Sequence, residues 1–292
     1  MATTDHFSYS QLATFFRCGE QYRRRYTPPY EKIPPGIAAI RGTGCHAARS
    51  HNMRQKMESG TDLAVTDLAD VAREKVMTQF AGGVWLAPDE RDIGEKKLRG
   101  KTVDVAVRLA KLDREKLQSA INPIFVEADR DKEGNREMGR ITIAHPDLPK
   151  PIWVYLDLVG KAIHSGEGGT NYEFHRIHDL KTSTKSPPDD IAHKSSQLTI
   201  QHMAWTVGGT LNPDSSAPIE TQFDYLIEKA NPEAKPYPTV QTRERQVAVL
   251  RRLAIAMQCI ERGDFPPCDE GYWLCTPKWC GYYPTCGYVI GR

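Results

Sequence analysis

Two acids and a lysine stand near the ends of two neighbouring predicted strands. Asp157 lies in the apolar run WVYLDLVGKA, and Asp179 and Lys181 lie near the end of NYEFHRIHDLKT. Because strand side chains alternate, Asp179 and Lys181 project from one face of their strand. Two carboxylates on adjacent strands repel each other unless a cation lies between them, and their hard oxygen ligands suit Mg²⁺ or Mn²⁺. A lysine beside such a metal could orient or deprotonate an attacking water, or stabilise charge on a phosphorane-like transition state.

The same residues also allow a purely structural interpretation. Both acids could be turn residues at strand ends, and Lys181 could simply be solvated. His46 follows two glycines in RGTGCHAA, where a histidine more often caps or borders a helix than binds a metal. Glu127 is either a further acid near the site or an exposed residue of an edge strand. His178 flanks Asp179, but alternation turns it to the opposite sheet face, so we exclude it from the predicted site.

Helix-forming and strand-forming segments alternate along the chain in the manner of an α/β protein. An N-terminal helix follows Ser8 and Ser10 in QLATFFRCGEQYRRRY, and periodicity predicts further helices over residues 43–58, 61–80 and 100–120. Strands are predicted over residues 123–131, 137–145, 151–164, 173–182 and 219–228. A helix over 189–209 separates the last two strands, and another covers TVQTRERQVAVLRRLAIAMQCIERG. Residues 27–36 and 231–239 are expected to be connections.

The composition is that of a folded protein with a sizeable core. The chain has 292 residues, of which 39% are hydrophobic. Thirty-nine Lys and Arg against 37 Asp and Glu give a formal charge of +2, so a basic surface for a polyanion would have to be local. We find no apolar run of about 18 residues and no signal-peptide layout at the N-terminus, which predicts a cytoplasmic protein without a membrane segment.

Four cysteines crowd the C-terminal segment CDEGYWLCTPKWCGYYPTCGYV: Cys268, Cys275, Cys280 and Cys286. Such density is not typical of core packing. In a cytoplasmic protein it points to metal or redox chemistry. Four thiolates would suit zinc, although the short CxxC spacing of zinc modules is absent. A zinc-stapled interaction protein without a catalytic site therefore stays an alternative. Cys45 and Cys259 are predicted to be buried thiols.

The chain resembles the RecB-like branch of the PD-(D/E)XK nuclease superfamily over nearly its whole length. FSYSQLATFFRCGEQYRRRY resembles the branch's N-terminal helix, and RGTGCHAA its glycine–histidine motif. YLDLVGKA is similar to the strand with the first acid, HDLKTS to the acid-x-lysine motif, and SSQLTIQHMAW to the glutamine helix that follows. Two positions depart from the pattern. Gly160 follows Asp157 instead of preceding it, and Gln201 stands where the family often has tyrosine, four residues after Gln197.

This resemblance implies a restriction-endonuclease-like α/β fold. Its core would be a central mixed β-sheet flanked by helices, with a helical N-terminal part and a cysteine-rich C-terminal iron–sulphur segment. We expect one RecB-like nuclease domain over 1–292, with a helical part (1–120), a catalytic core (121–230) and a C-terminal helix and cluster segment (231–292).

The implied activity is metal-dependent hydrolysis of DNA in recombination, repair, replication or end processing. The enzyme would be an exonuclease on single strands or DNA ends, with endonuclease activity also open. A helicase or recombination protein is the implied partner, and the size is compatible with a phage or CRISPR-associated enzyme. A catalytically silent DNA-binding or assembly module remains the second alternative.

The resemblance also assigns roles to residues. It implies that a Mg²⁺ or Mn²⁺ ion is held by His46, Asp157, Asp179 and the carbonyl of Leu180. Lys181 would assist the attack of water, and Gln197 would contact the lysine, an acid or a phosphate.

Iron–sulphur members of the branch place one cysteine in the N-terminal helix and three near the C-terminus. Cys18, Cys275, Cys280 and Cys286 fit that layout. A [4Fe–4S] cluster on these thiolates would staple the two ends of the chain together. Cys268 competes for one of the ligand positions.

A basic segment near the N-terminus is a candidate DNA contact. Arg23, Arg24 and Arg25 lie between Tyr22 and Tyr26. This mixture suits phosphate neutralisation and base stacking. A solvated basic helix end would have the same sequence.

Overall fold

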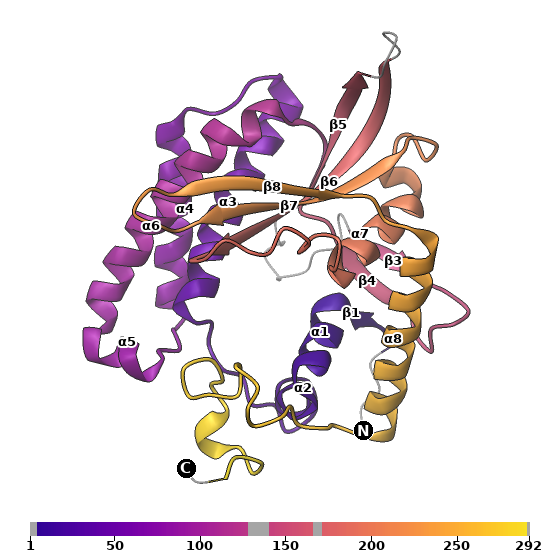
Figure 1. Cartoon of the computed structure of the whole chain (residues 1–292). Helices are drawn as coiled ribbons and strands as arrows, with labels where there is room; N and C mark the ends of the chain where they lie inside the picture. The colour runs from indigo at the N-terminus through magenta and orange to yellow at the C-terminus, as the bar shows by residue number, and fades with distance from the viewer. Residues whose placement is uncertain (1–4, 128–139, 166–170, 291–292) are drawn as a thin grey trace.

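A five-stranded mixed sheet runs through the middle of the computed structural model, which describes residues 5–127, 140–165 and 171–290 (Figure 1). Its strands lie in the order β2-β5-β6-β7-β8. The central pair, β6 and β7, is parallel, and the other neighbours are antiparallel. The strand bounds are β2 Asn122–Val126, β5 Leu158–Ser165, β6 Asn171–Ser183, β7 Ile219–Ile227 and β8 Glu233–Thr239. The predicted α/β class with a central mixed sheet is confirmed.

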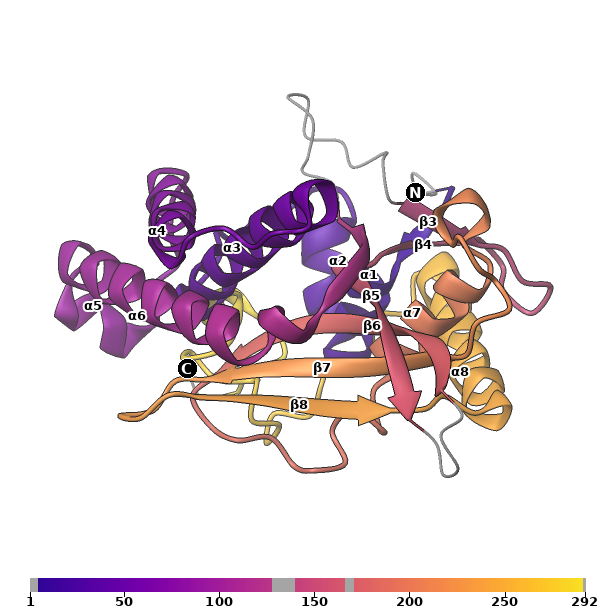
Figure 2. The same ribbon diagram turned by 90° about the horizontal axis from the view of Figure 1, so that it is seen from above.

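One face of this sheet is covered by the helical N-terminal part. These helices are α3 Ile37–Ser59, α4 Val65–Ala81, α5 Pro88–Ile93 and α6 Glu95–Lys116. Ile40 of α3 and Leu109 of α6 pack with Leu180 and Leu226 of the sheet in one buried cluster. The helices from α3 to α6 lie at one end of the molecule and α8 lies at the other (Figure 2). Within the described ranges, no helix is both long and apolar enough to cross a membrane.

The other face packs against a second helical layer and a small sheet. The helices are α1 Tyr9–Arg17, α7 Ser196–Thr206 and α8 Arg243–Arg262. The small sheet has the order β1-β4-β3, with bounds β1 Phe7–Ser8, β4 Ile152–Tyr155 and β3 Arg140–Ile143. Leu12, Trp205 and Leu253 meet Ile177 of β6 in the largest buried cluster. The central sheet is therefore enclosed between two apolar layers.

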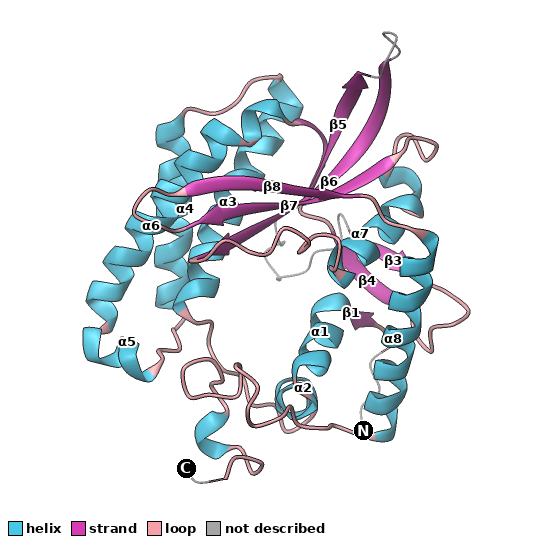
Figure 3. Cartoon of the chain, in the orientation of Figure 1, coloured by secondary structure: helices cyan, strands magenta, loops and turns pink. Residues whose placement is uncertain are grey.

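The N-terminal helical segment and the C-terminal segment lie against each other. The N-terminal helical segment is broken at Cys18 into α1 and α2, Gly19–Tyr26. Ser8 caps α1 through a capping box with Gln11, with Ser8 N–H donating to Gln11 Oε1 at 2.7 Å. After α8 the chain returns beside α2 as loops with one short turn of helix over Tyr283–Thr285 (Figure 3).

Three predicted elements need correction. The predicted strand 151–164 is two strands, because the chain leaves the small sheet after Tyr155 and enters the central sheet at Leu158. Residues 231–239 are not a mere connection, since they contain β8. Its two prolines are tolerated because β8 is an edge strand, whose outer side needs no donors. The helix predicted over 189–209 is confined to α7. The predicted strand segments 128–131 and 137–139 lie outside the described residues.

Candidate active site

The ends of β5 and β6 bring the two predicted acids together. Leu158 pairs with His178, so Asp157, just before β5, lies across from Asp179 in β6. The Leu180 N–H donates to Asp157 Oδ2 at 3.3 Å. Asp179 is 1% exposed, whereas the Asp157 side chain is partly open to solvent. The two carboxylates therefore meet at one place, as the sequence predicted.

Helix α3 adds the predicted histidine. His46 Nδ1 lies 3.3 Å from Asp157 Oδ2. Gly44 permits close packing of α3 against α4, because a Cβ there would lie 2.7 Å from Val76. A Cβ on Gly42 would lie 3.4 Å from Thr182 of β6, which is an ordinary contact distance.

Lys181 is held at the same carboxylate. Its ammonium forms an ion pair with Asp179 Oδ2 and lies 5.3 Å from the centre of the Phe223 ring. Burial disfavours the charged ammonium, but the Asp179 and Asp157 carboxylates outweigh this effect and raise the pKa of Lys181. Without a metal, Lys181 is therefore a cation at neutral pH.

The second oxygen of Asp179 is fixed by two amides of α7. Gln197 Nε2 donates to Asp179 Oδ1 at 2.6 Å, and Gln201 Nε2 donates to the same atom at 2.9 Å. Burial nevertheless raises the pKa of Asp179. Lys181 opposes this rise, and the nearby Asp157 charge adds to it. The glutamine predicted to contact the acid does so, and Gln201 makes the same contact.

The donor set suits a hard divalent cation. Within the described ranges, no three His, Cys, Asp or Glu side chains already surround one point as a metal site. Mg²⁺ does not require such a cage, because it keeps several waters and binds one or two carboxylates together with substrate phosphates. Asp179 Oδ2 is buried and, apart from its ion pair with Lys181, receives no well-oriented hydrogen bond from any described residue. A cation between Asp157 and Asp179 would relieve both this deficit and the repulsion between the carboxylates.

A second buried charged group lies on the opposite face of the sheet. Arg49 of α3 donates to Asp113 Oδ2 of α6 at 2.8 Å and to Asp224 Oδ2 of β7 at 2.6 Å. His178 Nδ1 lies 3.0 Å from that Asp224 oxygen, so alternation does turn it away from Asp179. We call Arg49, Asp113, His178 and Asp224 the buttress cluster, because it ties α3, one turn beyond His46, to α6 and β7. Our sequence analysis missed this cluster. The one sequence feature that could have indicated it is Asp224, an aspartate inside the apolar run QFDYLI.

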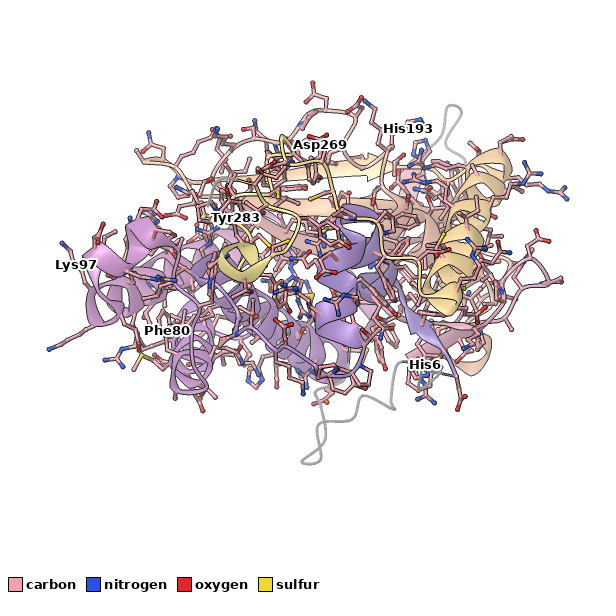
Figure 4. All side chains as sticks on the ribbon, turned by 90° about the horizontal axis from the view of Figure 1, so that it is seen from below. His6, Phe80, Lys97, His193, Asp269 and Tyr283 are labelled. Atoms are coloured by element: carbon pink, nitrogen blue, oxygen red, sulfur yellow. The ribbon has the colours of Figure 1, made fainter. Side chains whose placement is uncertain are left out.

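Five cysteines lie at one cavity, four from the C-terminal segment and one, Cys18, from between α1 and α2. Its lining includes Cys18, Cys268, Cys275, Cys280 and Cys286. The Cys268 N–H donates to Cys18 Sγ at 3.4 Å. Gly19 permits this approach, since a Cβ there would lie 2.6 Å from the main chain of Phe265 and Pro266. Figure 4 labels Asp269 and Tyr283 on this segment, which runs beside the N-terminal helices. Five thiols at one cavity outnumber the four ligands of an iron–sulphur cluster, but within the described residues no three His, Cys, Asp or Glu side chains form a group that could hold a metal ion.

The other two cysteines lie away from that cavity. Cys45 is fully buried between α3 and α6, as predicted, and burial raises the pKa of its thiol to about 12. Cys259 is only half-buried, with its sulphur 3.5 Å from the Arg262 guanidinium, so the prediction of full burial was wrong. The elevated pKa makes Cys45 an unreactive thiol and a suitable control in cysteine substitutions.

Most of the basic segment that was predicted to contact DNA instead contacts other parts of the protein. Tyr22 is 3% exposed and packs on Phe265, so it cannot stack on a base. Arg24 is 7% exposed and donates to the Thr285 carbonyl at 2.8 Å, which joins α2 to the C-terminal segment. Both residues are therefore corrected from DNA contacts to structural ones. Arg23 is partly exposed but paired with Glu20 at 2.7 Å, and Arg25 is exposed.

Comparisons with known proteins point to a nuclease family and to a similar fold. A family model of the PD-(D/E)XK nuclease superfamily matches residues 6–287. A search of curated proteins found no match. The crystal structure of a proposed exonuclease from Eubacterium rectale is similar over 99% of this chain and 90% of that chain, with a TM-score of 0.50 and 11% sequence identity. At this identity the similarity concerns the fold.

Proposed function

The chain belongs to the PD-(D/E)XK nuclease superfamily, and on that premise we propose that it is a metal-dependent deoxyribonuclease of the RecB-like branch. It would hydrolyse phosphodiester bonds of single-stranded DNA or DNA ends, chiefly as an exonuclease. The observation that carries the proposal is the meeting of Asp157 and Asp179 beside Lys181 and His46. A cytoplasmic location and a helicase or recombination partner belong to the same proposal.

Each residue of the site has a role in this reaction. His46, Asp157, Asp179 and the Leu180 carbonyl would hold Mg²⁺ or Mn²⁺, which when bound polarises the scissile phosphate and supplies an activated water. Gln197 and Gln201 fix the orientation of Asp179 through hydrogen bonds to one oxygen. Lys181 keeps a positive charge beside that carboxylate, where it can orient the water or stabilise the negative charge that develops on phosphate.

Digestion of end-labelled linear and circular single-stranded DNA tests the proposal. The wild type should degrade the linear strand with Mg²⁺ or Mn²⁺ and leave it intact in EDTA. Cutting of the circle would add an endonuclease activity. Lys181→Ala should be inactive, whereas Lys229→Ala should not change the rate, because Lys229 forms a surface ion pair with Glu233. Activity in EDTA, or full activity of Lys181→Ala, would refute the assignment.

A [4Fe–4S] cluster on Cys18, Cys275, Cys280 and Cys286 is the second part of the proposal. Five thiols around one cavity support it, as does the Arg24–Thr285 contact that already joins the two chain ends. Cys18→Ala should lose iron and sulphide and melt at a lower temperature, whereas Cys45→Ala should keep the iron. EDTA should stop cleavage without removing the visible absorbance, since the two metal sites are separate. Zinc in place of iron and sulphide would favour a zinc staple.

A further inference from the structure

A cavity of about 200 Å³ opens beside Asp157 and beside the two glutamines that hydrogen-bond to Asp179. Asp157 and Gln197 form part of its wall. The rest of the wall includes residues of α1 with its cap, β4 and α7: Ser8, Tyr9, Ser10, Trp153, Tyr155 and Gln201. A molecule in this cavity would therefore touch both the proposed catalytic residues and the N-terminal helix.

Gln201 carries an unused hydrogen-bond acceptor in this wall. Asp179 as a carboxylate only accepts hydrogen bonds, so the Gln201 amide must turn its Nε2 toward it. That orientation leaves Gln201 Oε1, which is buried and has no hydrogen-bond partner among the described residues. Buried polar atoms without a partner are rare in folded proteins. A donor group on a bound ligand would satisfy it.

Tyr9, which also lines the cavity, supplies a phenol hydroxyl. In the part of the chain that the structure describes, this hydroxyl makes no hydrogen bond to protein. Burial raises the pKa of Tyr9, while Lys181 and Arg252 oppose the rise, so the side chain is a neutral donor close to the active-site charges. Ser8 and Ser10 add two hydroxyls, whose oxygens lie 2.9 Å apart.

These groups favour one unpaired nucleoside as the occupant. The wall offers donors and acceptors for a base edge or a sugar hydroxyl, and Tyr9 contributes an aromatic ring to it. Trp153 is less suited to stacking, because His6 stacks on it and Arg140 lies 4.1 Å from its ring centre. A base inside a duplex would have to leave the stack to enter such a cavity.

We propose that this cavity holds the sugar and base of the nucleotide attached to the scissile phosphate, with Tyr9 and Gln201 as the residues that hydrogen-bond to it. The proposal rests on the proposed nuclease function and adds a substrate preference. Cleavage should require an unpaired nucleotide next to the bond that is cut.

A set of single-stranded oligonucleotides with one tetrahydrofuran abasic residue at successive positions tests this inference. For the wild type, the bond next to the abasic residue should be cut about tenfold more slowly than the same bond in unmodified DNA, as expected for loss of one stacked base. Tyr9→Phe should raise KM about fivefold with a smaller change in kcat, and Tyr9→Ala should remove most of the abasic effect. Tyr172→Phe is the matched control, because Tyr172 is 51% exposed and does not line the cavity. Melting curves identify any variant that fails to fold.

Two results would overturn the inference. One is a wild type that cuts beside abasic residues as fast as elsewhere, and the other is a folded Tyr9→Phe protein with wild-type KM on unmodified DNA. A wild type that cuts no unmodified strand with either metal would instead refute the nuclease function, and the subsite with it.

Discussion

Two charged clusters lie on opposite faces of the central sheet, one partly open to solvent and the other fully buried, and they are built in opposite ways. The catalytic cluster consists of His46, Asp157, Asp179 and Lys181, and the buttress cluster lies on the other face of β6 and β7. In the buttress cluster, the oxygens of Asp224 have charged or amide partners in Arg49, His178 and Gln222. In the catalytic cluster, two carboxylates share the single ammonium of Lys181, beside a cavity.

The difference appears in the electrostatics of two aspartates on adjacent strands. Burial alone would raise the pKa of Asp224, but Arg49 and His178 hold it well below its usual range. Burial does raise the pKa of Asp179, because Lys181 does not fully offset it and Asp157 adds repulsion. The partners available to offset burial therefore decide whether the pKa of the aspartate is lowered or raised. The charge of Asp224 is stabilised by its partners in the fold. The charge of Asp179 is not fully offset by Lys181.

The largest expected effect is on activity. Asp179→Asn should lower DNA cleavage at least about a thousandfold, equivalent to about 4 kcal/mol of transition-state stabilisation, because a carboxylate ligand is lost. Its free energy of unfolding in EDTA should change by less than about 1 kcal/mol, since the variant removes a charge that burial disfavours, and Lys181 is partly exposed. Single-turnover cleavage and urea unfolding measure the two quantities. If Asp179→Asn instead lost about 3 kcal/mol of stability, as expected for a residue of the buttress cluster, the two clusters would not differ in how much they stabilise the fold.

The buttress cluster should show the reverse pattern. Asp224→Asn should lower the free energy of unfolding by about 3 kcal/mol, because it removes one carboxylate from a fully buried ion-pair group. Activity per folded molecule should fall much less than in Asp179→Asn. Asp190→Asn, which breaks the exposed pair with Lys194, is the control and should cost under about 1 kcal/mol. An Asp224→Asn protein as stable as the wild type would show that the cluster does not stabilise the fold.

The stabilisation by Asp224 should also depend on pH. Because its folded pKa lies below its unfolded value of about 3.9, its carboxylate stabilises the protein above that pH, and this contribution is lost as the pH falls through the folded pKa. The stability difference between wild type and Asp224→Asn should therefore be constant near neutral pH and shrink below about pH 4. Urea unfolding of both proteins across this range measures it. If the stability difference grew as the pH fell, the folded pKa of Asp224 would not be lowered as assigned.

The comparison also shows how far the sequence could predict the site. The pairing of Asp157 with Asp179 follows from strand alternation and from the adjacency of consecutive strands, which are local rules. The buttress cluster follows from no local rule, since Arg49 is 64 positions from Asp113 and 175 from Asp224. Its partners meet only after α3, α6 and β7 have packed.

The wrong predictions in other parts of the chain have similar physical causes. The break between β4 and β5 occurs within one continuous apolar run, so hydrophobicity alone could not locate it. β8 was missed because two prolines suggested a connection, although an edge strand accepts them. Tyr22 and Arg24 looked like DNA contacts, but the C-terminal segment covers them, and it arrives from the far end of the chain.

The smallest expected effects on stability and activity come from replacing the glutamine that donates a hydrogen bond to the aspartate in each cluster. Gln197 donates to Asp179 and Gln222 donates to Asp224, each at 2.6 Å. Gln222→Leu should lower the free energy of unfolding by about 1–3 kcal/mol, because it leaves a buried carboxylate oxygen without its donor, and it should leave activity per folded molecule near wild type. Gln197→Leu should instead lower cleavage about tenfold with little change in stability, because Asp179 Oδ1 still accepts from Gln201 but loses part of its orientation. Urea unfolding and single-turnover cleavage of both variants test the division. If both variants lost stability and activity in the same proportion, the two faces would act as one unit rather than as a support and a reactive site.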